Sequence, residues 1–261
     1  MVKAVSSRDN AAYKEVARLI SSASHRKREG LSVLDGAHLL AAFLDSGGTP
    51  EALFVNRHGL EAPEIAALVA RSAPARVTLL ADSLYDALST VETPTGVLSV
   101  GSTPRSRPPP DDAAFALLLE GIQDPGNVGA LLRSAAAAGA SDVLLSPQCA
   151  FAWSPKVLRA AMGAHFAVNI AEGVDLAAWL AAYRGRSVAL MGGGKRSLYE
   201  LDLRGALALL VGNEGAGLSA ALAAAAREQA AIPMPGRMES LNAAAAGTVA
   251  LFEAARQRRA A

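Results

Sequence analysis

Short apolar runs alternate with longer amphipathic stretches along the first hundred residues. The apolar runs lie at 31–34, 52–55, 77–80 and 97–100, and the amphipathic stretches lie near 10–23, 36–45, 62–72 and 82–89. Strand-length runs separated by helix-length stretches are typical of mixed α/β folds. The pattern therefore predicts a small α/β domain at the N-terminus.

The same alternation is stronger in the second half of the chain. Its apolar runs lie at 115–119, 143–145, 166–170, 188–191, 206–211 and 230–232. Strands this apolar, separated by helical stretches, are typical of a parallel sheet whose two faces are both covered by helices. We expect a larger α/β domain with a parallel sheet.

A polar, proline-rich segment separates the two halves. Residues 101–112 read GSTPRSRPPPDD, and this stretch can neither join a central strand nor continue a helix. Three consecutive prolines stiffen it. We therefore expect a first domain at 1–105, a linker at 106–112 and a second domain at 113–261.

Composition excludes several classes of protein. Half of the 261 residues are hydrophobic, yet no stretch reaches the length of about 18 apolar residues that a membrane helix needs. The first residues lack the apolar core of a secretory signal, so we expect a cytoplasmic protein without a membrane partner. Cys149 is the single cysteine and the four histidines are scattered, which argues against a disulfide and against a metal site.

Charge alone does not identify a partner. The formal net charge is +1, which is not the strong basicity that marks many nucleic-acid-binding proteins. The first thirty residues are locally cationic and include Arg26, Lys27 and Arg28. This local excess fits a surface that follows phosphates, and it fits an ordinary solvated helix face equally well.

Ligands of open parallel sheets bind beyond the carboxyl ends of the strands, so the loops after the apolar runs are the first places to inspect. The loop after 115–119 contains the turn Asp124-Pro125-Gly126 and then Asn127, which is suited to cap a helix that carries Arg133. An ordinary capped helix with a solvent-facing arginine is the alternative.

The loop after 206–211 contains three glycines, Gly212, Gly215 and Gly217, with Glu214 among them. Glycines allow a backbone to approach a ligand closely or to adopt a positive φ. The carboxylate of Glu214 suits an amine or a hydroxyl. The alternative is a glycine-rich turn that serves packing only.

The loop after 230–232 reads PMPGRMESLN and leads into a helix of small residues at 243–247. Ser240 is placed to cap this last helix. Small residues at these positions permit very close contact between backbones, as a threaded or tightly docked helix needs.

Two common nucleotide-binding motifs are absent from the sequence. The run Gly192-Gly-Gly-Lys-Arg-Ser197 is similar to the end of a phosphate-binding P-loop, but that motif needs glycine at 189 and serine or threonine at 196. The chain has Ala189 and Arg196 instead. No G-x-G-x-x-G opens a helix after a first strand either, which argues against a conventional dinucleotide fold.

Taken in order, the three loops resemble the three signature motifs of the SpoU/TrmH family of SPOUT RNA methyltransferases. The matching residues are Asn127-x-Gly129-x-x-x-Arg133, Gly212-Asn-Glu-Gly-x-Gly-Leu, and Ile232-Pro-Met-x-Gly followed by Ser240-Leu-Asn242. The segment 154–164 is similar to the stretch between the first two motifs. Residues 26–36 and 88–96 resemble the L30e-like substrate-binding domain of the rRNA-modifying members, so the likeness covers nearly the whole chain.

The resemblance implies a C-terminal domain with a parallel sheet and a trefoil knot, an exception to the rule that folds avoid knots. It also implies S-adenosylmethionine as cofactor, and a homodimer whose interface forms the active site. By the same resemblance, the backbone around five positions holds the cofactor: Met191, Gly212, Ile232, Met234 and Leu241.

The implied reaction is an in-line attack of a ribose 2′-hydroxyl on the sulfonium methyl group. Arg133 matches the essential arginine of the family. Because a guanidinium stays protonated, we expect it to grip a phosphate and to stabilise the developing alkoxide, with a phosphate oxygen or water taking the proton. The other polar candidates at the centre are Asn127, Glu214, Ser240 and Asn242. Arg159, Arg26, Lys27 and Arg28 are the candidates for RNA contacts.

The chain departs from the family pattern at a few positions. Ala243 and Ala244 follow Asn242 where many relatives carry a valine and a serine, and Asp35 stands where relatives usually have glutamate. The shorter acid is suited to a similar capping role. Neither change touches the three central motifs.

Several alternatives stay open at this point. A base-directed methyltransferase would use a similar cofactor pocket, although such families lack the asparagine and arginine pair. A catalytically silent RNA-binding protein would have no chemical need for Asn127, Arg133, Glu214 and Asn242. An L30e-like domain favours structured rRNA, most of all 23S rRNA, over tRNA. A housekeeping role and an antibiotic-resistance role share this architecture.

Overall fold

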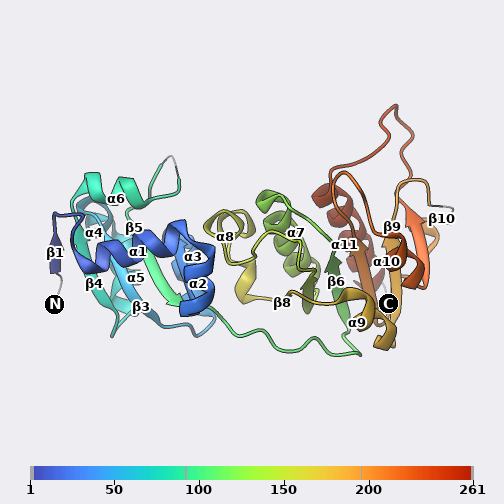
Figure 1. Cartoon of the computed structure of the whole chain (residues 1–261), viewed down its shortest axis with the longest axis horizontal. Helices are drawn as coiled ribbons and strands as arrows, with labels where there is room; N and C mark the ends of the chain where they lie inside the picture. The colour runs from blue at the N-terminus through green and yellow to red at the C-terminus, as the bar shows by residue number, and fades with distance from the viewer. Residues whose placement is uncertain (1–2, 92, 195, 260–261) are drawn as a thin grey trace. The chain divides into compact units, whose positions relative to one another are not determined.

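The computed structural model describes residues 3–91, 93–194 and 196–259 (Figure 1). The chain forms two compact units. The first contains Met1–Arg105 and Trp153–Phe166, and the second contains Ser106–Ala152 and Ala167–Ala261. Each unit has its own sheet and its own core.

The first unit contains a five-stranded sheet in the order β1-β4-β3-β5-β2. Strands β1, β4 and β3 are parallel, whereas β5 runs antiparallel to β3 and β2. Its elements are β1 (Lys3–Val5), α1 (Ala11–Ser21), α2 (Ala23–Glu29), β2 (Leu31–Asp35), α3 (Ala37–Asp45), β3 (Pro50–Val55), α4 (Arg57–Glu61), α5 (Pro63–Arg71), β4 (Arg76–Leu80), α6 (Asp82–Leu88), β5 (Val97–Ser102), α8 (Pro155–Ala161) and the short 3-10 helix η1 (Ala164–Phe166).

Helices cover both faces of this sheet. Phe54 and Leu98 belong to a buried cluster with side chains of α1 and α6, whereas their neighbours Leu53 and Val97 belong to a second cluster with side chains of α3 and α5. Successive residues of a strand point to opposite faces, so each strand serves both clusters. All four predicted apolar runs lie within strands of this sheet, and only the short β1 has no such run.

The second unit contains a seven-stranded sheet in the order β10-β12-β9-β11-β6-β7-β8, and every pairing is parallel. Its elements are β6 (Phe115–Leu119), α7 (Pro125–Ala138), β7 (Asp142–Leu145), β8 (Asn169–Glu172), α9 (Leu176–Ala182), β9 (Arg186–Leu190), β10 (Arg196–Ser197), η2 (Leu198–Glu200), β11 (Leu207–Val211), α10 (Ala220–Ala225), β12 (Glu228–Ala231) and α11 (Ala243–Arg259). The predicted fold class, a parallel α/β domain with a smaller α/β domain, is confirmed. The trefoil knot stays a prediction.

The strand order brings four loops to one place. The chain moves from β6 through β7 and β8 toward one edge, then returns to β9 on the other side, and β11 later fills the position between β9 and β6. Such a change of direction is where parallel sheets form a ligand crevice at the carboxyl ends of their strands. The loops after β6, β9, β11 and β12 all leave from this edge.

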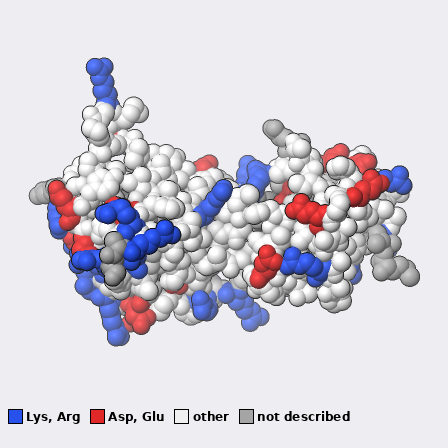
Figure 2. Space-filling view, turned by 180° about the vertical axis from the view of Figure 1, so that it is seen from behind, with Lys and Arg blue, Asp and Glu red and all other residues white. Residues whose placement is uncertain are grey.

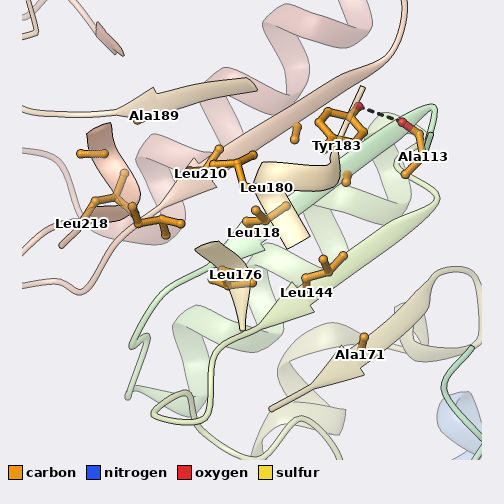
Figure 3. Packing of buried hydrophobic residues seen from close by; sticks show 14 residues of the cluster. Ala113, Leu118, Leu144, Ala171, Leu176, Leu180, Tyr183, Ala189, Leu210 and Leu218 are labelled. Atoms are coloured by element: carbon orange, nitrogen blue, oxygen red, sulfur yellow. Dashed lines mark hydrogen bonds between the residues drawn. The ribbon is translucent and has the colours of Figure 1, made fainter. Parts of the chain in front are cut away.

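Buried side chains on the two faces of the sheet hold these strands in place. Leu118 and Leu210 point from β6 and β11 toward Leu180 of α9 (Figure 3). On the opposite face α11 packs against α7 and β11. A Cβ added at Gly247 would lie 2.3 Å from Cδ2 of Leu131, so the small residue expected there does permit a very close contact.

The segment predicted as a linker is packed against the second unit. Trp179 Nε1 donates to the carbonyl of Pro109 at 3.2 Å, and the backbone N–H of Arg184 donates to the carbonyl of Asp111 at 3.0 Å. These bonds hold part of the segment 106–112 along α9, so it does not behave as a free spacer.

Two further sequence predictions differ from the structure. The apolar run 166–170 predicts one strand, but Phe166 ends η1 and the strand begins at Asn169. The predicted domain 113–261 includes Trp153–Phe166, whereas the contacts group this segment with the first unit. The aromatic contact between Phe166 and Phe43, with ring centroids 5.3 Å apart, gives the physical reason. No helix in the described ranges is long and apolar enough to span a bilayer.

Candidate functional site

The loops after β6 and β11 are joined by hydrogen bonds directly beyond the strand ends. The carboxylate of Glu120 accepts from the backbone N–H and from the hydroxyl of Ser219, both at 2.7 Å. Asn213 Nδ2 donates to the carbonyl of Gly121 at 2.8 Å. The sequence motifs alone assign no role to Glu120, Asn213 and Ser219. The strand pattern could have indicated them, because the residues that follow two neighbouring parallel strands lie side by side when the last residues of those strands stand opposite each other.

The glycine-rich loop closes on itself. Asn213 and Gly217 exchange two backbone hydrogen bonds of 3.0 and 2.9 Å, and Asn213 Oδ1 accepts from the N–H groups of Gly215 and Ala216. A Cβ at Gly212 would lie 2.2 Å from the backbone carbon of Gly217, and Gly217 itself has a φ of 69°. The close backbone approach predicted for these glycines is therefore between two parts of the same loop, at Gly212 and Gly217.

The sequence suggests Asn127 as the cap of α7, but in the structure Asn127 does not cap this helix. Asp124 is the N-cap residue, and its Oδ1 accepts from the backbone N–H of Asn127 at 2.8 Å. Asp124 precedes the proline that starts the helix, which is the favoured order of cap and first residue. The side chain of Asn127 is left to donate from Nδ2 to Oε1 of Glu214 at 2.7 Å.

Asn242, and not Ser240, caps the last helix. Asn242 Oδ1 accepts from the backbone N–H groups of Ala244 and Ala245 at 2.9 and 3.2 Å. Its Nδ2 donates to Oδ1 of Asn127 at 3.0 Å. The predicted cap at Ser240 is wrong because that residue lies two positions too early to reach the N–H groups of this helix.

These bonds form a directional chain across the three loops. The N–H groups of α11 require an acceptor, which fixes the orientation of the Asn242 amide and makes its nitrogen the donor toward Asn127. The Asn127 amide must then accept with its oxygen and donate with its nitrogen, so Oε1 of Glu214 is the acceptor at the end of the chain. Three of the predicted polar residues thus meet in one exposed site with a defined acceptor at its end.

The other two predicted catalytic residues lie apart from this chain. Arg133 and Ser240 are exposed, and within the described ranges neither side chain forms a hydrogen bond or an ion pair. Arg133 lies six residues after Asn127, which is about 9 Å along a helix. It shares a face of α7 with Ala137, which lines a groove of about 520 Å³ between the C-terminal parts of α7 and α11.

The predicted cofactor positions line the same edge of the sheet. Gly212 is buried, whereas Met191, Ile232 and Met234 are half-buried, and Leu241 is 42% exposed. The N–H of Met191 donates to the carbonyl of Ala230 at 2.9 Å, which ties the loop after β9 to β12.

The chemistry of this edge fits S-adenosylmethionine. Large apolar side chains stay exposed beside loop backbone, the most exposed being Met238 at 75%. Apolar surface suits the faces of an adenine ring, and free backbone groups suit its polar edge and the ribose. No group of three or more His, Cys, Asp or Glu side chains suited to a metal occurs among the residues that the structure describes.

The candidates for RNA contacts separate into two groups. Arg26 is only 5% exposed, and its guanidinium donates to the carbonyls of Leu19 and Ile20 near the end of α1. Burial lowers the pKa of Arg26. The prediction that Arg26 contacts RNA is therefore corrected, since its donors satisfy the last carbonyls of a helix.

Lys27 and Arg28 are exposed, and Arg28 donates to Glu29 at 2.9 Å. Arg159 is half-buried, with Nη1 donating to the carbonyl of Thr90 at 2.5 Å. On the face shown in Figure 2, cations and anions lie side by side on both units. The described residues on this face therefore form no continuous cationic band.

Comparisons with known proteins point to one family. The sequence profile of the SpoU rRNA Methylase family matches residues 114–252. An uncharacterised tRNA/rRNA methyltransferase of Synechocystis is 32% identical over 98% of this chain and 94% of its own length. The 23S rRNA (guanosine(2553)-2′-O)-methyltransferase RlmP of Bacillus subtilis is 27% identical over 96% of this chain and 98% of its own length.

A solved structure is similar over the same extent. The AdoMet-bound rRNA methyltransferase of Sinorhizobium meliloti superposes with a TM-score of 0.85 at 30% identity, and the match covers 98% of each chain. The likeness therefore includes both units, not only the part that carries the three loops.

Proposed function

The chain belongs to the SpoU rRNA methylase family, and on that premise we propose that it transfers a methyl group from S-adenosylmethionine to a ribose 2′-hydroxyl of rRNA. The observation that carries this proposal is the hydrogen-bonded chain from Glu214 through Asn127 to Asn242, because it unites all three signature loops at one edge of the sheet. The full-length match to RlmP supports ribose as the site and 23S rRNA as the substrate.

The residues around this edge would hold the cofactor. Met191, Ile232, Met234 and Leu241 would contact it with side chains and backbone, while Gly212 lets the glycine-rich loop close beside it. Bound S-adenosylmethionine supplies an electrophilic methyl group on a positively charged sulfur. The protein therefore has to bring the hydroxyl oxygen into line and manage one proton.

Arg133 and Glu214 have different parts in this proposal. A guanidinium is not a base at neutral pH, so Arg133 binds the neighbouring phosphate and stabilises negative charge as it develops on the ribose oxygen. Glu214 offers a carboxylate held by Asn127 and suited to accept a hydrogen bond from a hydroxyl or an amine. The proton passes to a phosphate oxygen or to water.

A second copy of the chain completes the site. Phe252 is 48% exposed and lines the groove between α7 and α11 together with small residues such as Ala137 and Ala138 and with the arginines at 256, 258 and 259. An exposed aromatic side chain among small residues, with cations beside it, is suited to burial in a homodimer. Arg133 lies on the same face of α7, so docking on this groove would bring it to the partner and explain its separation from Asn127 within one chain.

Labelled methyl transfer tests the reaction. Wild-type protein and the variant R133A are incubated with labelled S-adenosylmethionine and with unmodified 23S rRNA, 16S rRNA or tRNA. We expect label in 23S rRNA with the wild type and a loss of about a hundredfold or more with R133A. Cofactor binding without label in any RNA would contradict the proposal and favour a silent RNA-binding protein.

Mixing two inactive variants tests the shared site. If Arg133 acts on the partner's site, a heterodimer of R133A and E214Q chains contains one site with both residues intact. Mixed chains should then recover part of the wild-type activity. No recovery despite heterodimer formation would show that both residues act within one chain.

The cytoplasmic location expected from the sequence stays a prediction.

A further inference from the structure

The segment Trp153–Phe166 adds a helix to the first unit. Its helix α8 packs against β2, and Phe166 contacts Phe43 of α3. His38 Nε2 lies 3.2 Å from the carbonyl of Met162. A Cβ at Gly163 would lie 2.8 Å from the Cβ of Ala42, so the segment sits tightly against α3. The cations on α8 are therefore part of the surface of this unit.

Asp35 organises the turn that follows α6. Its Oδ2 accepts from the N–H of Thr90 at 2.8 Å, from the hydroxyl of Thr90 at 3.0 Å and from the hydroxyl of Ser89 at 3.2 Å. Asp35 does not cap α3, whose N-cap Gly36 has no side chain to do so. Three donors on one carboxylate oxygen make this the principal tie between the end of β2 and the turn at residues 89–90.

Thr90 in turn holds Arg159. Nη1 of Arg159 donates to the carbonyl of Thr90 at 2.5 Å and lies 3.4 Å from its hydroxyl oxygen. Among the described residues, Nη2 and Nε of Arg159 have no acceptor, and Arg159 takes part in no ion pair. Lys156 lies one turn earlier on α8 and is exposed. Residues three apart share a helix face, so Lys156 and Arg159 lie on the same side of α8.

We propose that Asp35 is a positioning residue that acts through Thr90 on Arg159, and that Arg159 and Lys156 grip a backbone phosphate of the RNA. The inference rests on the proposed function and names a substrate contact for it. A free arginine side chain loses rotamer entropy when it is fixed, so a guanidinium that is already held binds a phosphate with a smaller entropy loss.

The nature of the partner matters for this role. A carboxylate bound directly to Arg159 would neutralise its charge, whereas the carbonyl of Thr90 orients the guanidinium and leaves the charge available. Asp35 thus fixes the position of Arg159 through Thr90 without neutralising the charge of Arg159. Two guanidinium nitrogens remain for a phosphate, which accepts such paired donors well.

A double-mutant cycle on RNA binding tests the inference. Affinity for a 23S rRNA fragment is measured by fluorescence anisotropy at several salt concentrations for R159A, D35A and the double variant. We expect R159A to weaken binding about tenfold and to reduce the salt slope by about one. D35A should weaken binding about three- to tenfold, and the double variant should bind no more weakly than R159A alone.

Charge supplies the matched control. D35A removes one negative charge, which by itself should strengthen binding to a polyanion. D45A makes the same change in net charge at an exposed acid of this unit that pairs with Arg71, so its binding should be unchanged or tighter. The isosteric variant D35N, expected to weaken binding less than D35A, is used in the same cycle if D35A lowers the melting temperature of the protein.

Two results would overturn the inference. Losses in D35A and R159A that multiply in the double variant would mean that Asp35 acts independently of Arg159. An unchanged salt slope in R159A would mean that Arg159 touches no phosphate. Binding is measured without methyl transfer, so a wild type that binds RNA but transfers no methyl group would refute the proposed function and leave this inference standing.

Discussion

Replacing Gly212 with alanine should open the glycine-rich loop and disable the site. The added Cβ would lie 2.2 Å from the backbone carbon of Gly217 and 2.2 Å from the backbone nitrogen of Leu218. Ordinary contacts are 3.4 Å or longer, and neither obstructing atom belongs to a side chain that can rotate away. The loop must therefore move by more than about 1 Å.

The size of the effect follows from this geometry. Forcing an extra carbon into such a contact costs about 1–3 kcal/mol, and each kcal/mol lowers the melting temperature of a chain of this size by about 2–4 °C. Glu214 lies two residues later, so its 2.7 Å bond with Asn127 should break as well. A charge-assisted bond of this kind is worth about 1.5–3 kcal/mol, which corresponds to a loss of roughly ten- to a hundredfold in transfer rate.

Gly215 is the matched control in the same loop. A Cβ there would lie 3.6 Å from its nearest neighbour, Oδ1 of Asn213, and the backbone of Gly215 has no positive φ. Thermal melting, calorimetric titration of S-adenosylmethionine and methyl transfer are compared for G212A and G215A. We expect G215A to melt like the wild type, because its added Cβ meets no close neighbour. If G212A matched G215A in all three measurements, the argument from the closed loop would be refuted.

Three further predictions follow from individual contacts. N242A should lower the free energy of unfolding by about 1 kcal/mol because α11 loses its cap. N242D should keep the cap and the stability but lose activity, because its side chain cannot donate to Asn127. If N242A and N242D lost the same stability, the capping role would be contradicted. F252E should convert a dimer into monomers in light scattering and abolish methyl transfer, and an intact dimer would refute the proposed interface. Burial raises the pKa of Tyr183, whose hydroxyl donates to the carbonyl of Ala113 (Figure 3), to about 12. Its contribution to stability is thus full below pH 10 and is lost between about pH 10 and 12. In denaturant titrations, the free energy of unfolding of Y183F should therefore fall less steeply over this pH range than that of the wild type. An equally steep fall in both proteins would contradict this.

The sequence predicts most of the fold and the location of the site. Apolar runs with helical stretches between them are enough to predict two α/β domains, because buried parallel strands must be apolar on both faces. The rule that ligands lie beyond strand ends then selects the loops containing Asn127, Glu214 and Asn242, and in the structure both Glu214 and Asn242 are hydrogen-bonded to Asn127.

Details that depend on competition between nearby residues were not predictable. Asp124 and Asn127 are both good caps, and the proline at 125 decides for Asp124 only once the helix start is known. Arg26 has the sequence context of a surface cation, but the end of α1 folds back onto it and takes up its donors. The docking of Trp153–Phe166 on the first unit depends on contacts with residues more than a hundred positions away, which no local pattern reveals.

The most direct test of the central claim is the chemical position of the transferred methyl group. Labelled 23S rRNA from the wild-type reaction is hydrolysed in alkali, which cleaves RNA only where a 2′-hydroxyl is free. Our account predicts that the label appears in alkali-resistant dinucleotides and is lost with R133A and E214Q. Label in mononucleotides would show that a base receives the methyl group, and the proposed ribose chemistry would then be wrong.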